Sequence, residues 1–169
     1  FNVTHFAAAR MGGLMLGFAH DGGIKALVIY PMNALASDQA RRIAQLIANE
    51  PALAGIRAGL YVGEEGSHAE MGTDHLIDIK RQLQLDPPDI LLTNYKMLDY
   101  LLIRPKDRQL WAKNTAETLR YVVVDELHTF DGAQGTDLSC LIRRVQARLD
   151  TPPGHLVCVG TSATLGDDG

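Results

Sequence analysis

The apolar residues of this chain fall into two patterns. Short apolar runs bounded by turn or charged residues are typical of buried strands, whereas apolar residues that recur every three or four positions are typical of helices with one buried side. Five runs fit the first pattern, at residues 26–30, 56–62, 89–93, 121–124 and 155–160. The segments between them fit the second. We therefore expect an α/β fold with a parallel sheet and helices on both faces.

The expected helices span residues 1–20, 34–49, 67–85 with a loose start, 97–103, and a last segment that ends near residue 149. In the last helix, five apolar residues share one side and three arginines lie toward the other. The apolar residues are Leu138, Leu141, Ile142, Val145 and Leu149.

Composition places this chain among globular proteins. The length of 169 residues suits one domain, and 46% apolar residues can fill a core. The net charge of −4 argues against a surface coated with basic residues, although a local phosphate-binding surface is compatible with it. The pattern shows no signal peptide or membrane span, so we expect no membrane partner. Cys140 and Cys158 fall in predicted elements, which is typical of reduced, buried thiols in a cytoplasmic protein, and we expect no disulfide.

Two adjacent carboxylates, Asp125 and Glu126, follow the apolar run 121–124. Ligands of an open α/β sheet bind at the carboxyl ends of its strands, so this pair lies where chemistry is expected. One carboxylate can help to hold Mg²⁺, which is otherwise bound by waters and substrate phosphates. The second can orient or deprotonate a water that attacks a γ-phosphate. The alternative is a strand that ends in solvated acids before a turn.

Three motifs that each follow an apolar run resemble those of superfamily-two helicases of the DEAD/DEAH type. DELH at 125–128 resembles the Walker B box, motif II, with leucine in the third place. PMNALASDQ at 31–39 resembles motif Ia, and TSAT at 161–164 resembles motif III. The motifs occur in the family order. The resemblance implies the first RecA-like domain of a P-loop NTPase motor, and it covers essentially the whole chain.

The resemblance also implies an ATP-dependent helicase or translocase. Asp125 would coordinate Mg²⁺, Glu126 would position and activate water, and His128 with Ser162 and Thr164 would couple the ATP site to strand movement. A second RecA-like domain of the same protein would complete the site. The region around DELHTFDGAQGTDL is more similar to bacterial DNA-repair or phage-defence proteins than to RNA-remodelling enzymes. This similarity favours DNA over RNA as the partner, and it admits accessory proteins of such a system.

Several polar residues and one glycine that follow the strands are candidates for contacts with a nucleic acid. They are Asn33, Ser37, Gln39, Gly63, Thr93, Asn94 and Tyr95. The motif Ia-like segment lacks the basic residue of the family pattern PTRELA. The alternatives are that Asn33 and Ser37 only cap a helix, and that Tyr95 is half-buried core instead of a stacking surface for a base.

No GxxxxGK[ST] loop occurs in the sequence. In relatives this loop, motif I, lies just before the helix with which this chain opens. We therefore expect residues 1–169 to be a partial RecA-like ATP-binding domain that lacks motif I and the second RecA-like domain. In relatives the motif I strand lies inside the sheet, so its loss should expose apolar edges.

Two other functions fit parts of the sequence. One is a nucleic-acid-binding module that has no turnover of its own, which a GxxxxGK[ST] motif upstream in the gene would reject. The other is a metal-dependent hydrolase with Asp125, Glu126 and His128 as ligands, but neighbouring residues at a strand end point to different sides. His68 and His75 have no Cys or acidic cluster at ligand spacing, so we expect solvated histidines there.

Overall fold

The computed structural model describes residues 22–162. Five parallel strands form one sheet in the order β2-β3-β1-β4-β5. The strands are β1 (Ala26–Tyr30), β2 (Ala58–Tyr61), β3 (Ile90–Asn94), β4 (Tyr121–Val124) and β5 (Val157–Gly160). All five predicted strands are confirmed, with ends that differ by at most two residues. The helix expected over residues 1–20 and the candidate residue Thr164 lie outside the described residues.

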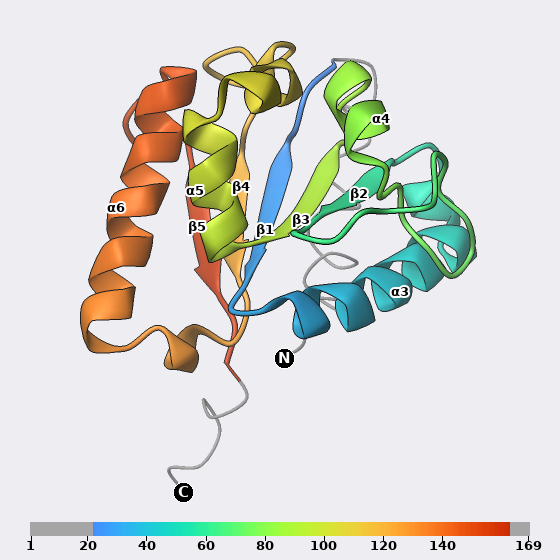
Figure 1. Ribbon diagram of the computed structural model, residues 1–169, viewed down its shortest axis with the longest axis horizontal. Helices are drawn as coiled ribbons and strands as arrows, with labels where there is room; N and C mark the ends of the chain where they lie inside the picture. Colours follow the sequence, from blue (N-terminus) through green and yellow to red (C-terminus); the bar gives the residue numbers. More distant parts are fainter. Residues whose placement is uncertain (1–21, 163–169) are drawn as a thin grey trace, which may run out of the picture.

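Helices cover both faces of this sheet, as predicted (Figure 1). One face is covered by α3 (Asn33–Asn49). The other is covered by α4 (Lys80–Leu85), α5 (Tyr95–Ile103) and α6 (Gly132–Leu149). Short 3₁₀ helices lie in the connections, namely η2 (Pro51–Leu53), η3 (Pro105–Trp111) and η4 (Leu127–Thr129).

The core has two layers, one on each face of the sheet. In β1, Ala26, Val28 and Tyr30 pack in the layer of α3, whereas Leu27 and Ile29 pack in the layer of α5 and α6. A strand that is buried on both faces needs a continuous apolar run, and β1 has one. In α6, Leu138, Leu141, Val145 and Leu149 are buried, as predicted, and Ile142 is partly buried.

The predicted helix over residues 67–85 is wrong for most of its length, because only α4 at its end is helical. The preceding residues form a loop that folds around Asp78. The Asp78 carboxylate accepts hydrogen bonds from the backbone N–H groups of Ser67 and His68 at 2.8 and 2.6 Å. Such bonds from a side chain to the backbone compete with helical ones. Leu76 and Ile77 nevertheless reach the core, as expected, because the loop packs beside β2.

The predicted burial of both cysteines is also wrong. Cys140 is exposed because it lines an open hollow between α5 and α6 and is not among the buried residues of α6. Cys158 is exposed because β5 is an edge strand of the described sheet, where Val157 is 47% exposed. Partial burial still raises the pKa of the Cys158 thiol.

Candidate functional site

The residues that follow the strands gather at one edge of the sheet. Because all five strands are parallel, their carboxyl ends share this edge, and the strand order decides which residues become neighbours. Residues that follow β2, β3 and β1 occupy one half of the edge. Residues that follow β4 and β5 occupy the other half, so the motif II-like and motif III-like segments lie side by side.

Asp125 lies at the end of β4 and is only 8% exposed. The Thr161 hydroxyl donates a hydrogen bond to Asp125 Oδ1 at 2.5 Å. The backbone N–H of Asp125 donates to the Ile29 carbonyl, and that of Thr161 donates to the Val124 carbonyl, both at 2.9 Å. These bonds continue the sheet ladder past the strand ends and fix the position of the carboxylate. Thr161 is the first residue of the TSAT motif, but it is not among the site residues that the sequence predicts.

Glu126 has the left-handed backbone conformation, with φ 52° and ψ 46°. This conformation is uncommon for residues other than glycine, and it is frequent at functional sites. His128 Nδ1 lies 3.3 Å from Glu126 Oε2 and 3.0 Å from Ser162 Oγ. His128 therefore links the second carboxylate of motif II to the motif III-like serine, and the structure brings together three of the predicted site residues.

Tyr30 lies beside Asp125 in the register of β1 and β4, and its side chain is fully buried. Its hydroxyl has no hydrogen-bond partner among the described residues. Burial, and then the negative charge of Asp125, raises the pKa of the Tyr30 phenol. The phenol therefore stays neutral and adds no second negative charge next to the carboxylate.

The donor set at Asp125 fits a magnesium ion. Mg²⁺ prefers oxygen ligands and is usually held by one or two carboxylates together with waters and phosphates. Asp125 and Glu126 supply such oxygens at the strand ends. No group of three or more His, Cys, Asp or Glu side chains in residues 22–162 is arranged to hold a metal by itself. This arrangement matches a metal shared with a phosphate substrate better than a protein-only metal site.

His68 and His75 belong to the loop around Asp78, away from this pair of carboxylates. Their rings stack with centroids 4.1 Å apart. His68 Nδ1 lies 2.9 Å from Asp78 Oδ2, and His75 Nδ1 lies 2.8 Å from Asp74 Oδ1. The hydrogen bond to His75 lowers the pKa of Asp74. Both imidazoles are half exposed, in agreement with solvated histidines, and their carboxylate partners help to close the loop.

In the other half of the edge, the structure joins the beginnings of two helices. Asn94 Nδ2 donates a hydrogen bond to Asn33 Oδ1, which links the start of α5 to the start of α3. Asn94 Oδ1 accepts from the backbone N–H of Met97 at 2.7 Å and so caps α5. Asn94 is only 8% exposed, whereas Asn33 is half-buried. Asn33 is thus more accessible to a nucleic acid than Asn94.

Thr93, Tyr95 and Ser37 have different environments. Thr93 is fully buried, and its hydroxyl donates to the Tyr61 carbonyl at 2.7 Å, which does not fit a direct contact of this side chain with a nucleic acid. Tyr95 is half-buried and packs edge-on against Phe130 with ring centroids 5.6 Å apart. Ser37 is exposed on α3, and Gln39 of the same helix is half-buried. No side chain caps α3, so Asn33 and Ser37 are not needed for that purpose.

The two glycines of the turn after β2 differ in what they allow. A Cβ at Gly66 would lie 2.1 Å from the Asp78 carbonyl oxygen, so the chain itself requires glycine there. A Cβ at Gly63 would lie 3.7 Å from Asn33 Nδ2, which is an ordinary contact, and Gly63 is exposed. Only Gly63 is therefore open to a partner from outside.

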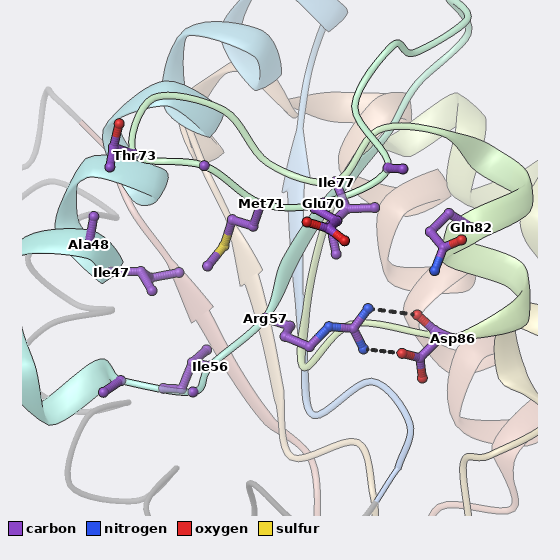
Figure 2. A pocket seen from close by; sticks show the side chains of 14 residues that line it. Ile47, Ala48, Ile56, Arg57, Glu70, Met71, Thr73, Ile77, Gln82 and Asp86 are labelled. Atoms are coloured by element: carbon purple, nitrogen blue, oxygen red, sulfur yellow. Dashed lines mark hydrogen bonds and ion pairs between the residues drawn. The ribbon is translucent and has the colours of Figure 1, made fainter.

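A hollow of about 770 Å³ lies apart from the predicted site residues (Figure 2). It opens between the end of α3, the start of β2 and the loop at residues 69–73. Within it, Arg57 is held by the Asp86 carboxylate at 2.7 Å and by the Asp86 carbonyl at 3.4 Å. Residues 56 and 57 precede β2, so the hollow is near the amino end of that strand. None of the predicted site residues lines it.

In the described part of the chain, no helix is long and apolar enough to cross a membrane.

Comparisons with known proteins point to helicases. The family model of the DEAD/DEAH box helicase matches residues 6–168. The Druantia protein DruE of Escherichia coli is 38% identical over 99 residues, which are 55% of this chain and 5% of DruE. The ATP-dependent helicase Lhr-Core of Methanothermobacter thermautotrophicus is 30% identical over 146 residues, which are 86% of this chain and 16% of Lhr-Core.

Two solved helicase structures share this fold. The helicase MrfA bound to DNA and AMPPNP superposes with a TM-score of 0.67 and 25% identity, over 98% of this chain and 21% of MrfA. The helicase Lhr of Mycobacterium smegmatis bound to ssDNA and AMP-PNP superposes with a TM-score of 0.64 and 25% identity, over 94% of this chain and 19% of Lhr. The sheet is thus that of a RecA-like helicase domain. Because the family model covers nearly the whole sequence, the chain belongs to the DEAD/DEAH box helicase family.

Proposed function

We propose that the full-length protein is an ATP-dependent helicase or translocase, and that this chain is part of its first motor domain. The observation that carries the proposal is the cluster at the ends of β4 and β5. There Thr161 holds Asp125, and His128 connects Glu126 to Ser162. A strand end with only solvated acids would not need either contact.

The residues have separate roles in this proposal. Asp125, fixed by Thr161 and the backbone, would hold Mg²⁺ through its carboxylate oxygens, and Mg²⁺ would neutralise charge on the ATP phosphates. Glu126 would orient the attacking water and accept its proton on a carboxylate oxygen. His128 would sense the charge of Glu126, because it lies 3.3 Å from that carboxylate. A change in the charge of Glu126 would thus alter its contact with His128. Ser162, and Thr164 by its place in the motif, would transmit this change to the residues that follow β1, β2 and β3, where the nucleic acid is proposed to bind.

We propose DNA as the nucleic acid, within a repair or phage-defence system. Support comes from the solved structures of MrfA and Lhr, which are bound to DNA. Asn33, Ser37, Gln39, Gly63 and Tyr95 are the proposed contacts because each is at least partly accessible. Thr93 and Asn94 would support them from beneath. A second RecA-like domain of the same protein would provide the opposite wall of the ATP site.

Nucleic-acid-stimulated ATP hydrolysis by the full-length protein tests the proposal, with Glu126→Gln as the decisive variant. Loss of the general base should lower stimulated turnover by about 10²- to 10⁴-fold and leave nucleotide binding intact. Asp131→Asn is the matched control, because Asp131 is a nearby exposed acid whose side chain makes no capping bond. This control should keep the activity of the unmodified protein.

The other candidate is a nucleic-acid-binding module without turnover. It is the better account if the full-length protein binds nucleic acid but shows no hydrolysis that depends on Glu126. Stimulation by RNA alone would instead keep the motor and overturn the choice of DNA.

A further inference from the structure

One lysine side chain lies at the β2 half of the strand-end edge, although the local sequence of the motif Ia-like segment predicts no basic residue there. The motif Ia-like segment at residues 31–39 contains no Lys or Arg. In space, however, α4 brings Lys80 to the turn after β2. Lys80 Nζ donates hydrogen bonds to the Gly63 carbonyl and to Glu65 Oε1, both at 3.2 Å.

The Lys80 ammonium group is held at the turn, but its ion pair with the exposed Glu65 is weak. The Lys80 side chain is 21% exposed, so its aliphatic part is covered while its head reaches the turn. Its carboxylate partner, Glu65, is 87% exposed. Ion pairs to such an exposed group contribute little to stability, so a phosphate can displace Glu65 at small cost.

Lys80 is connected to the proposed nucleic-acid surface by a chain of contacts. Lys80 bonds to the Gly63 carbonyl, a Cβ built on Gly63 would lie 3.7 Å from Asn33 Nδ2, and Asn33 bonds to Asn94. The ammonium group therefore stands at the same edge as the exposed turn at Gly63 and the start of α3. An ammonium on a flexible stem is well suited to a phosphate, to which it acts as a point charge.

We propose that Lys80 contacts a backbone phosphate of the bound nucleic acid and exchanges Glu65 for it on binding. Lys80 thereby supplies the charge that residues 31–39 lack. This inference rests on the proposed function and assigns a binding residue within it.

The salt dependence of nucleic-acid affinity tests this assignment. The full-length protein and its Lys80→Gln variant are titrated with a labelled single-stranded DNA of mixed sequence, at 50 to 200 mM salt. Loss of one phosphate contact should reduce the slope of log affinity against log salt by about 0.7. The difference in affinity between the two proteins should then narrow roughly 2.5-fold over this range. Lys80→Arg should restore the slope, and Glu65→Gln should raise affinity by removing the competing carboxylate.

Arg81→Gln is the matched control, because it removes one positive charge from the next, exposed position of the same helix. It should leave the slope unchanged. The assignment is overturned if Lys80→Gln keeps the slope of the unmodified protein, or if both variants change it equally. If Lys80→Gln does not fold, an unchanged affinity of Glu65→Gln and a lowered slope for Lys80→Arg overturn it. If the unmodified protein does not bind nucleic acid at all, the proposed function itself fails.

Discussion

At the scale of single residues, the contact between Thr161 and Asp125 is the one most directly tied to the proposed chemistry. The Thr161 side chain donates to a nearly buried carboxylate, and a hydrogen bond to a charged group contributes about 1.5–3 kcal/mol. Thr161→Val keeps the shape of the side chain and removes the donor. We expect turnover by the full-length protein to fall roughly tenfold or more, since about 1.4 kcal/mol corresponds to a factor of ten.

Thr161→Ser is the control for this prediction, because it keeps the hydroxyl. Stimulated ATP hydrolysis should stay near that of the unmodified protein. Equal losses in the valine and serine variants would mean that the methyl group, and not the hydrogen bond, matters at this position.

At the scale of elements, Asn94 is the N-cap residue of α5. Its Oδ1 satisfies the backbone N–H of Met97, which the helix itself leaves without a partner. Asn94→Ala should lower the free energy of unfolding by about 1–2 kcal/mol, through loss of the cap and of the bond to Asn33. Asn94→Ser should lose less, because serine is also a good cap. Urea unfolding checks both, and equal losses would show that the cap contributes nothing.

At the scale of the whole molecule, Asp86 joins three distant parts of the chain. Its carboxylate pairs with Arg57 before β2 and with Lys113 after η3. The hydrogen bond from Lys113, and then the charge of Arg57, lowers the pKa of Asp86. A carboxyl whose pKa is lowered on folding adds stability above its unfolded pKa of about 3.9, and loses it as the pH falls through the folded value.

The resulting prediction concerns Asp86→Asn. At pH 7 this variant should unfold at a lower urea concentration than the unmodified protein. The loss in free energy of unfolding should be less than about 1 kcal/mol, because the ion pairs are half exposed. The difference should shrink as the pH falls below about 3.9 and through the lowered folded pKa of Asp86. Asp137→Asn, at an exposed position of α6, should show no such pH dependence. A deficit of Asp86→Asn that does not shrink as the pH falls below about 3.9 would contradict a charge effect.

Much of the fold could be predicted because its signals are local. β1, β3 and β4 are buried on both faces, so they must be apolar almost throughout, and α3 and α6 bury one side each, so their apolar residues recur with the helical period. The loop at residues 66–79 could not be predicted in this way. It is held by Asp78 and by a bridge to β2, and these contacts leave no periodic pattern.

The sequence by itself determined the strands, the acidic pair at the end of β4 and the family motifs, because each depends on residues next to one another in the chain. Only the tertiary structure decided that Thr161 holds Asp125, that His128 meets Glu126 and Ser162, and that Lys80 stands at the Gly63 turn. These contacts follow from the strand order β2-β3-β1-β4-β5 and from a loop fold. Both depend on packing between distant segments, which local patterns do not encode.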